Sequence, residues 1–194
     1  RREEALALLP PAMARAYAAE EAAGRAPVFR ENSERAILAR LRSMTEADFA
    51  ALDQGREGLW NRLYDASCTA ATLQALLEAA KTKRYALARL RRMTLWAYLG
   101  LTPADVPERM PYLRVLAASG TGCRLLAEMR TSAAAPVLTK PAQVRQLGPE
   151  ARRLFAHEVR ATDLYTLAYP RREAAEGGTE WREGPVILGG PAPC

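Results

Sequence analysis

The residues most suited to binding chemistry lie in one short stretch, residues 81–93, which reads Lys-Thr-Lys-Arg-Tyr-Ala-Leu-Ala-Arg-Leu-Arg-Arg-Met. It holds six cations and no acid: Lys81, Lys83, Arg84, Arg89, Arg91 and Arg92. A phosphate backbone would neutralise these charges and release its counterions. Arginine offers planar forks that fit phosphate, and Tyr85 is suited to stacking on an unpaired base. The stretch therefore predicts an RNA- or phosphate-binding surface.

Two other interpretations of this stretch stay open. A run of like charge is also typical of a solvated helix face, or of a face that pairs with acids on a neighbouring domain. If Lys81 and Lys83 open a helix, its N–H groups and dipole add to their charge and favour an anion. That anion is either an RNA phosphate or part of a nucleotide triphosphate.

A helix over residues 82–99 is expected to position these cations. At 100° per residue, Ala86, Leu90, Met93 and Ala97 gather on one side and form the predicted core face. The other side carries Arg84, Arg89, Arg91 and Arg92. Gly100 supplies the stop signal. Anchoring of the apolar side would make the guanidinium groups a rigid array.

Four further polar residues are candidates for a cleft: Glu57, Arg62, Arg160 and Asp163. The first two are also explained by a helix start with an acid in its positive first turn, and the last two by an ordinary amphipathic helix. His157 is the sole histidine, and Cys68, Cys123 and Cys194 lack the spacing of a metal-binding pair. We therefore expect no catalytic group and no metal site in this chain.

The charge of the 194-residue chain, +6 overall, is unevenly distributed. Residues 1–80 hold 10 arginines and 12 acids, whereas residues 81–194 hold 18 lysines and arginines and 10 acids. The later part is the basic one, which indicates that a polyanionic partner meets it. The sequence has no leader-like start and no apolar run near the roughly 20 residues that span a bilayer, so we expect a cytoplasmic protein without membrane contact.

The composition predicts a mainly α fold, because alanine, leucine and arginine dominate. Short apolar runs at 112–117 and 136–139 flank a helical pattern, which predicts a small βαβ-like element in the C-terminal half. We expect a helical domain over residues 1–110 that includes the basic helix 82–99. Residues 111–170 are expected to form the small α/β element with a long C-terminal helix packed on it. Residues 171–194 are expected to be loop or flexible tail.

Four motifs occur in an order that resembles one protein family. They are Glu57-Gly-Leu-x-Asn-Arg62, then Lys81-Thr-Lys-Arg-Tyr85 with Arg89-Leu90-x-Arg92, then Pro111-Tyr-Leu-Arg-Val-Leu116, and then Arg160-Ala-Thr-Asp-Leu-Tyr165. This pattern resembles the C-terminal region of the bacterial tRNA(Met) cytidine acetate ligases, a family of predicted nucleotidyltransferases. The resemblance covers nearly the whole chain up to about Pro170.

The resemblance implies an enzyme family that activates acetate with ATP as acetyl-adenylate and then acetylates N4 of the wobble cytidine in elongator tRNA(Met). Its adenylating site lies mainly in an N-terminal nucleotidyltransferase domain with a His-x-Gly-His-type motif, which this sequence lacks. We therefore expect ATP and acetate as cofactors of the full-length protein and none for this fragment, which is not catalytic alone. The expected partners are tRNA and the missing N-terminal domain.

By this resemblance, the cations hold the tRNA backbone or reach the ATP phosphates: Lys81, Lys83, Arg84, Arg89 and Arg92. Glu57, Arg62, Arg160 and Asp163 match family motifs without an assigned role. The sequence-based hypothesis is a tRNA-binding domain of an ATP-dependent tRNA-modifying ligase. The alternative is a helical protein-interaction module whose basic face docks an acidic partner domain.

Overall fold

The chain divides into two compact units in the computed structural model, which describes residues 2–52 and 58–189. The first unit contains the described residues up to Leu101 and the segment Asp163–Gly177. The second contains Thr102–Thr162 and the described residues from Gly178 onward. The boundary between the units lies after Leu101, earlier than the expected boundary at residue 110. The segment Asp163–Gly177 also belongs to the first unit.

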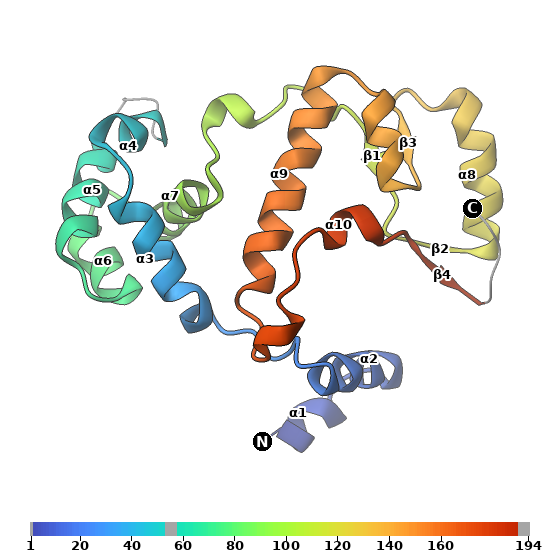
Figure 1. The fold of residues 1–194 in the computed structure, drawn as a ribbon, viewed down its shortest axis with the longest axis horizontal. Helices are drawn as coiled ribbons and strands as arrows, with labels where there is room; N and C mark the ends of the chain where they lie inside the picture. The colour runs from blue at the N-terminus through green and yellow to red at the C-terminus, as the bar shows by residue number, and fades with distance from the viewer. Residues whose placement is uncertain (1, 53–57, 190–194) are drawn as a thin grey trace. The chain divides into compact units, whose positions relative to one another are not determined.

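Helices build the first unit, as its alanine- and leucine-rich sequence predicts (Figure 1). They are α1 (Arg2–Ala7), α2 (Pro11–Ala22), α3 (Glu34–Arg42), α4 (Glu46–Leu52), α5 (Leu59–Thr69), α6 (Leu73–Ala80) and α7 (Leu87–Leu99), with the 3-10 turns η1 (Arg30–Ser33) and η4 (Arg172–Ala174). Pro10 and Pro11 separate α1 from α2, because proline is accepted at a helix start and not in its interior.

The core of the first unit lies among α3–α7. One apolar stripe on α3, made of Ile37, Leu38 and Leu41, is buried there, and Phe49 meets Tyr64 edge to face at 5.5 Å between ring centroids. A capping box opens α4, because the Thr45 amide donates to Asp48 Oδ2 at 2.8 Å and the Asp48 amide donates to Thr45 Oγ1 at 3.3 Å. Local capping and core burial therefore agree in placing these helices.

Short parallel strands and helices form the second unit. In chain order they are η2 (Pro103–Asp105), β1 (Leu113–Arg114), β2 (Ala117–Ser119), α8 (Gly120–Ser132), β3 (Val137–Leu138), η3 (Pro141–Gln146), α9 (Pro149–Thr166), α10 (Thr179–Arg182) and β4 (Val186–Leu188). The last turn of α9 belongs to the first unit. β1 pairs in parallel with β3, and α8 lies between them in sequence. The mainly α prediction is thus confirmed, and the strands have the expected strand–helix–strand order.

The expectation of a loop or tail from residue 171 onward is wrong for the described residues. η4 and α10 lie in this segment, and β4 pairs in parallel with β2, with Ala118 opposite Ile187. A sequence pattern of Gly, Pro and charge hides this strand, because three residues paired to a distant partner leave no periodic signal.

An ion-pair network around Arg114 ties together the second unit. Arg114 Nη1 donates to Glu158 Oε2 at 2.8 Å, and Nη2 pairs with Glu180. The Tyr112 hydroxyl donates to the other Glu158 oxygen at 2.6 Å, and the Thr162 hydroxyl donates to Glu180 Oε1 at 2.5 Å. Burial, together with the bond to Glu158, raises the pKa of Tyr112. The two carboxylates on separate elements are thereby both satisfied.

A second polar contact lies where the second unit begins. Asp105 accepts hydrogen bonds from the Thr102 amide and hydroxyl at 2.9 Å each, and its Oδ1 lies 3.3 Å from His157 Nε2. Burial alone would raise the pKa of Asp105, but the bonds from Thr102 and the nearby His157 outweigh it and hold that pKa below its ordinary value.

No helix within residues 2–52 and 58–189 has the length and apolar character that crossing a membrane requires.

Shortening a core side chain of the first unit should destabilise the protein strongly. Leu63 is fully buried, so Leu63→Ala should lower the free energy of unfolding by about 2–5 kcal/mol, through lost burial and a cavity. Leu8, which is 86% exposed, is the matched control, and Leu8→Ala should change it by less than about 0.5 kcal/mol. Urea unfolding measures both; equal losses would contradict the assignment of the core.

Asp105 should make stability depend on pH. Since its folded pKa lies below the unfolded value of about 3.9, its charge stabilises the fold fully above that value. The contribution is lost as the pH falls through the folded pKa. Asp105→Asn should therefore cost about 1 kcal/mol at about pH 7 and clearly less at about pH 2. Urea unfolding at both values tests this, with the exposed Glu108→Gln as control. A cost that does not change with pH would refute the role of the charge.

Candidate nucleic-acid interface

The basic stretch begins in a loop and not in a helix. The predicted helix over residues 82–99 is correct only from Leu87 onward, because residues 81–86 connect α6 to α7 without helical structure. Ala86, the residue before α7, has extended backbone angles of φ −66° and ψ 138°. The Thr82 hydroxyl accepts the Arg84 amide at 3.2 Å, a local bond that competes with helix formation. Lys81 and Lys83 therefore lie on this loop.

Tyr85 anchors the loop to the core. Its side chain is 7% exposed and belongs to the core cluster of the first unit. The Cζ atoms of Arg84 and Arg89 lie 5.6 and 6.0 Å from the ring centroid, within the range of cation–π attraction. The expectation that Tyr85 stacks on an RNA base is therefore corrected: the ring is occupied by the core and by two arginines.

Arg62 stabilises the chain directly before the same loop. Its Nε donates to the Ala80 carbonyl at 3.2 Å and its Nη2 to the Ala79 carbonyl at 3.1 Å. These are the last residues of α6, whose carbonyls lack partners within the helix. Arg62, predicted as a possible cleft residue, thus caps the helix that leads into Lys81.

The helical part of the stretch is oriented by its apolar side. Leu90, Met93 and Ala97 are buried in α7 as the periodicity predicts, whereas Ala86 is exposed and precedes the helix. Arg91 and Arg92 are exposed on the same helix. Because the buried residues fix the rotation of α7, both guanidinium groups must project to solvent.

Five of these cations are exposed and form no ion pair with any residue in 2–52 or 58–189: Lys81, Lys83, Arg84, Arg91 and Arg92. We call these five residues the basic surface. Arg89 is half-buried beside Tyr85. By contrast, Arg25 and Arg114 elsewhere in the chain are paired with carboxylates. The basic surface therefore has the charge and the accessibility that a polyanion requires.

The remaining predicted cleft residues lie in separate segments of the chain. Glu57 lies outside the described residues. Arg160 is exposed on α9 in the second unit, and Asp163 is half-buried in the segment that belongs to the first. No group of three or more His, Cys, Asp or Glu side chains suited to a metal ion occurs in the described parts of the chain.

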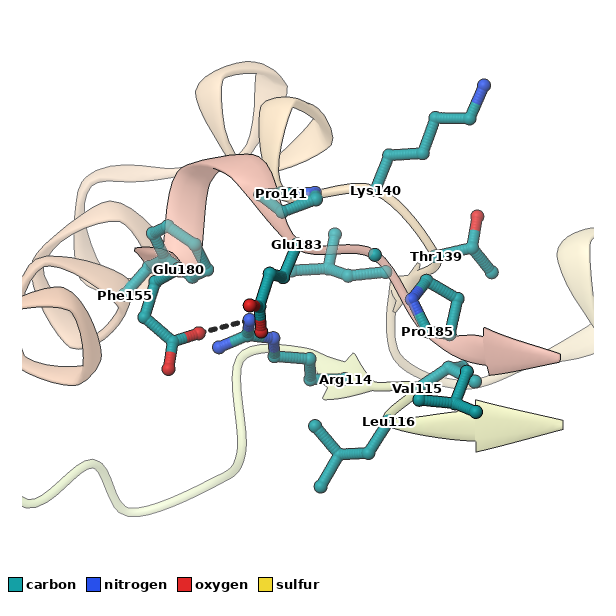
Figure 2. A pocket seen from close by; sticks show the side chains of 13 residues that line it. Arg114, Val115, Leu116, Thr139, Lys140, Pro141, Phe155, Glu180, Glu183 and Pro185 are labelled. Atoms are coloured by element: carbon teal, nitrogen blue, oxygen red, sulfur yellow. Dashed lines mark ion pairs between the residues drawn. The ribbon is translucent and has the colours of Figure 1, made fainter. Parts of the chain in front are cut away.

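The second unit also contains a cavity that no sequence motif predicts. It has a volume of about 210 Å³, and its wall includes Arg114, Glu180 and Glu183 (Figure 2). Arg114 lies in the motif that begins at Pro111, and this motif could have marked Arg114 as a candidate site residue. Glu180 and Glu183 lie in the segment expected to be a tail, where no sequence motif marks a candidate site.

Comparison with known proteins places the chain among nucleotidyltransferases. Residues 1–180 match the HIGH nucleotidyl transferase family. A tRNA(Met) cytidine acetate ligase of Acetivibrio thermocellus is 29% identical over 175 residues, which make up 87% of this chain and 42% of that protein.

Two solved structures of Thermotoga maritima TmcAL share the fold. The apo form I superposes with a TM-score of 0.90 at 25% identity, over 97% of this chain and 48% of that one. Form II, bound with alpha-thio ATP, superposes with a TM-score of 0.86 at 24% identity, over 96% of this chain and 50% of that one. The chain thus spans half or less of the length of these relatives.

The family match covers all the motifs quoted above, from Glu57 to Tyr165, and extends through both units. The similarity to a tRNA(Met) cytidine acetate ligase agrees with the resemblance that those motifs carry. The chain belongs to the HIGH nucleotidyl transferase family.

Proposed function

We propose that this chain binds tRNA through the basic surface, as part of an ATP-dependent tRNA-modifying ligase. The observation that carries the proposal is the exposure of five cations that have no ion-pair partner in the described residues, on elements fixed by core packing. Such cations gain most from phosphates, because a polyanion both neutralises them and releases counterions.

The geometry favours recognition of a backbone over recognition of bases. Arg91 and Arg92 are neighbours on one helix, and Lys81, Lys83 and Arg84 follow the loop that precedes it. Side chains in such a row track successive phosphates, whereas the one aromatic ring among them, Tyr85, is buried. On this proposal the basic surface positions the RNA and adds little sequence preference of its own.

The relatives support the choice of tRNA as the polyanion. The Acetivibrio protein is named for tRNA(Met) and for cytidine acetate ligation, and a Thermotoga TmcAL was crystallised with alpha-thio ATP. We extend this to the full-length protein as ATP-dependent activation of acetate and N4-acetylation of the wobble cytidine of elongator tRNA(Met). The proposal assigns RNA binding, and not adenylation, to the chain described here.

Removing arginines from the basic surface should weaken tRNA binding and its salt dependence. In the triple variant Arg84→Ala, Arg91→Ala and Arg92→Ala, the slope of log K against log [salt] should flatten by about 2–3, since each lost phosphate contact contributes about 0.7–0.9. Filter binding or anisotropy with elongator tRNA(Met), from about 50 to about 200 mM salt, measures this.

A control variant with the same change in net charge distinguishes an effect of the basic surface from an effect of net charge alone. Arg130, Arg152 and Arg153 are exposed arginines of the second unit, and their replacement by alanine should leave most of the affinity intact. Equal losses in both triple variants would mean that affinity follows net charge alone. If tRNA does not bind even at low salt and an acidic protein domain does, the surface is a protein-docking site and the proposal is wrong.

A further inference from the structure

The cavity of the second unit lies where parallel strands end. Val115 and Leu116 follow β1, and Thr139 and Lys140 follow β3, its parallel partner; all four line the cavity. In open α/β sheets, ligands bind outside the carboxyl ends of the strands. The volume of about 210 Å³ is below that of a pocket for a drug-sized ligand, which indicates a small occupant.

One carboxylate of the cavity is used by the protein itself and another is available. Glu180 is bonded to Arg114 and to the Thr162 hydroxyl. Glu183 also lines the cavity, is exposed, and forms no side-chain hydrogen bond or ion pair with the part of the chain that the structure describes. An ionised carboxylate accepts hydrogen bonds only, so Glu183 selects a ligand with N–H or O–H donors.

Thr139 lines the same cavity, but its hydroxyl oxygen is not accessible from it. The residue is 5% exposed, and its Oγ1 is buried without a hydrogen-bond partner among the described residues. Buried hydroxyls without a partner are rare, because each forfeits a hydrogen bond that water would supply. The cavity therefore offers the Glu183 carboxylate, and not the Thr139 hydroxyl, to a polar ligand group.

The rest of the wall is apolar and its rim is cationic. Pro141 and Pro185 contribute ring surfaces, whereas the Phe155 ring is buried against Arg114 and Trp181. The Lys140 ammonium extends outward, away from Arg114 and Glu183 (Figure 2). Apolar rings with one acceptor suit a planar heterocycle that carries N–H donors, and a cation at the rim suits a phosphate attached to it.

We infer that this cavity binds one unstacked RNA base that presents amino-group donors on its Watson–Crick edge, with Glu183 as the acceptor. Guanine offers N1–H and N2–H to one carboxylate, and cytosine offers N4–H. Uracil has one N–H donor on that edge, N3–H, but it is flanked by two carbonyl oxygens that the carboxylate repels. The inference rests on the proposed function for its ligand, RNA, but involves a different set of residues from the basic surface.

Short RNAs that differ in one base test the inference on the full chain. Anisotropy with labelled UUGUU and UUCUU should give dissociation constants roughly 5- to 150-fold lower than with UUUUU, the discrimination expected of one good base contact. Glu183→Ala should abolish this difference and leave the affinity for UUUUU unchanged or slightly improved. Because Glu183 is exposed, the variant should remain folded, which circular dichroism checks.

Matched variants distinguish the failure of this inference from that of the proposed function. Glu128→Gln removes an exposed carboxylate outside the cavity and should preserve the base preference. Equal binding of all three RNAs by the native chain would overturn the base site and leave the basic surface intact. Absence of RNA binding would overturn both. Binding of spermidine that depends on Glu183, without base preference, would replace the base site by a polyamine site.

Discussion

The burial of one side of α7 is the constraint on which the basic surface depends. Leu90, Met93 and Ala97 are held in the core of the first unit, and their packing fixes the rotation of the helix. Arg91 and Arg92 therefore have no low-energy alternative to projecting into solvent. Mutual repulsion among like charges costs less free energy than exposing that apolar side would, so the helix keeps its cations on the solvent side.

The loop before α7 shows how residues of two family motifs stabilise the structure. Arg62 caps α6 through the Ala79 and Ala80 carbonyls, and Tyr85 fastens the loop to the core. Lys81, Lys83 and Arg84 are thus displayed from a segment that is fixed at both ends. Restraint of this kind lowers the ordering entropy that a flexible basic tail would lose on meeting RNA.

In the second unit, charged side chains join the short strands and helices. Its strands contain two or three residues each, so the paired backbone groups contribute little and side chains must join the elements. Arg114 does so by bonding Glu158 on α9 and Glu180 on α10, while its guanidinium also lies 5.3 Å from the Phe155 ring. The cavity beside this network exists because α10 and the residues after it close over the ends of β1 and β3.

Local signals in the sequence determined the helical class, the capping box at Thr45, the buried face of α7 and the concentration of cations at residues 81–92, because each depends on neighbours within a few turns. Tertiary structure alone decided the burial of Tyr85 and the capping role of Arg62. It also decided the pairing of β4 with β2 and the position of Glu183 in a cavity wall. These features depend on contacts between segments distant in sequence, whose energies outweigh local propensity and leave no periodic trace in the chain.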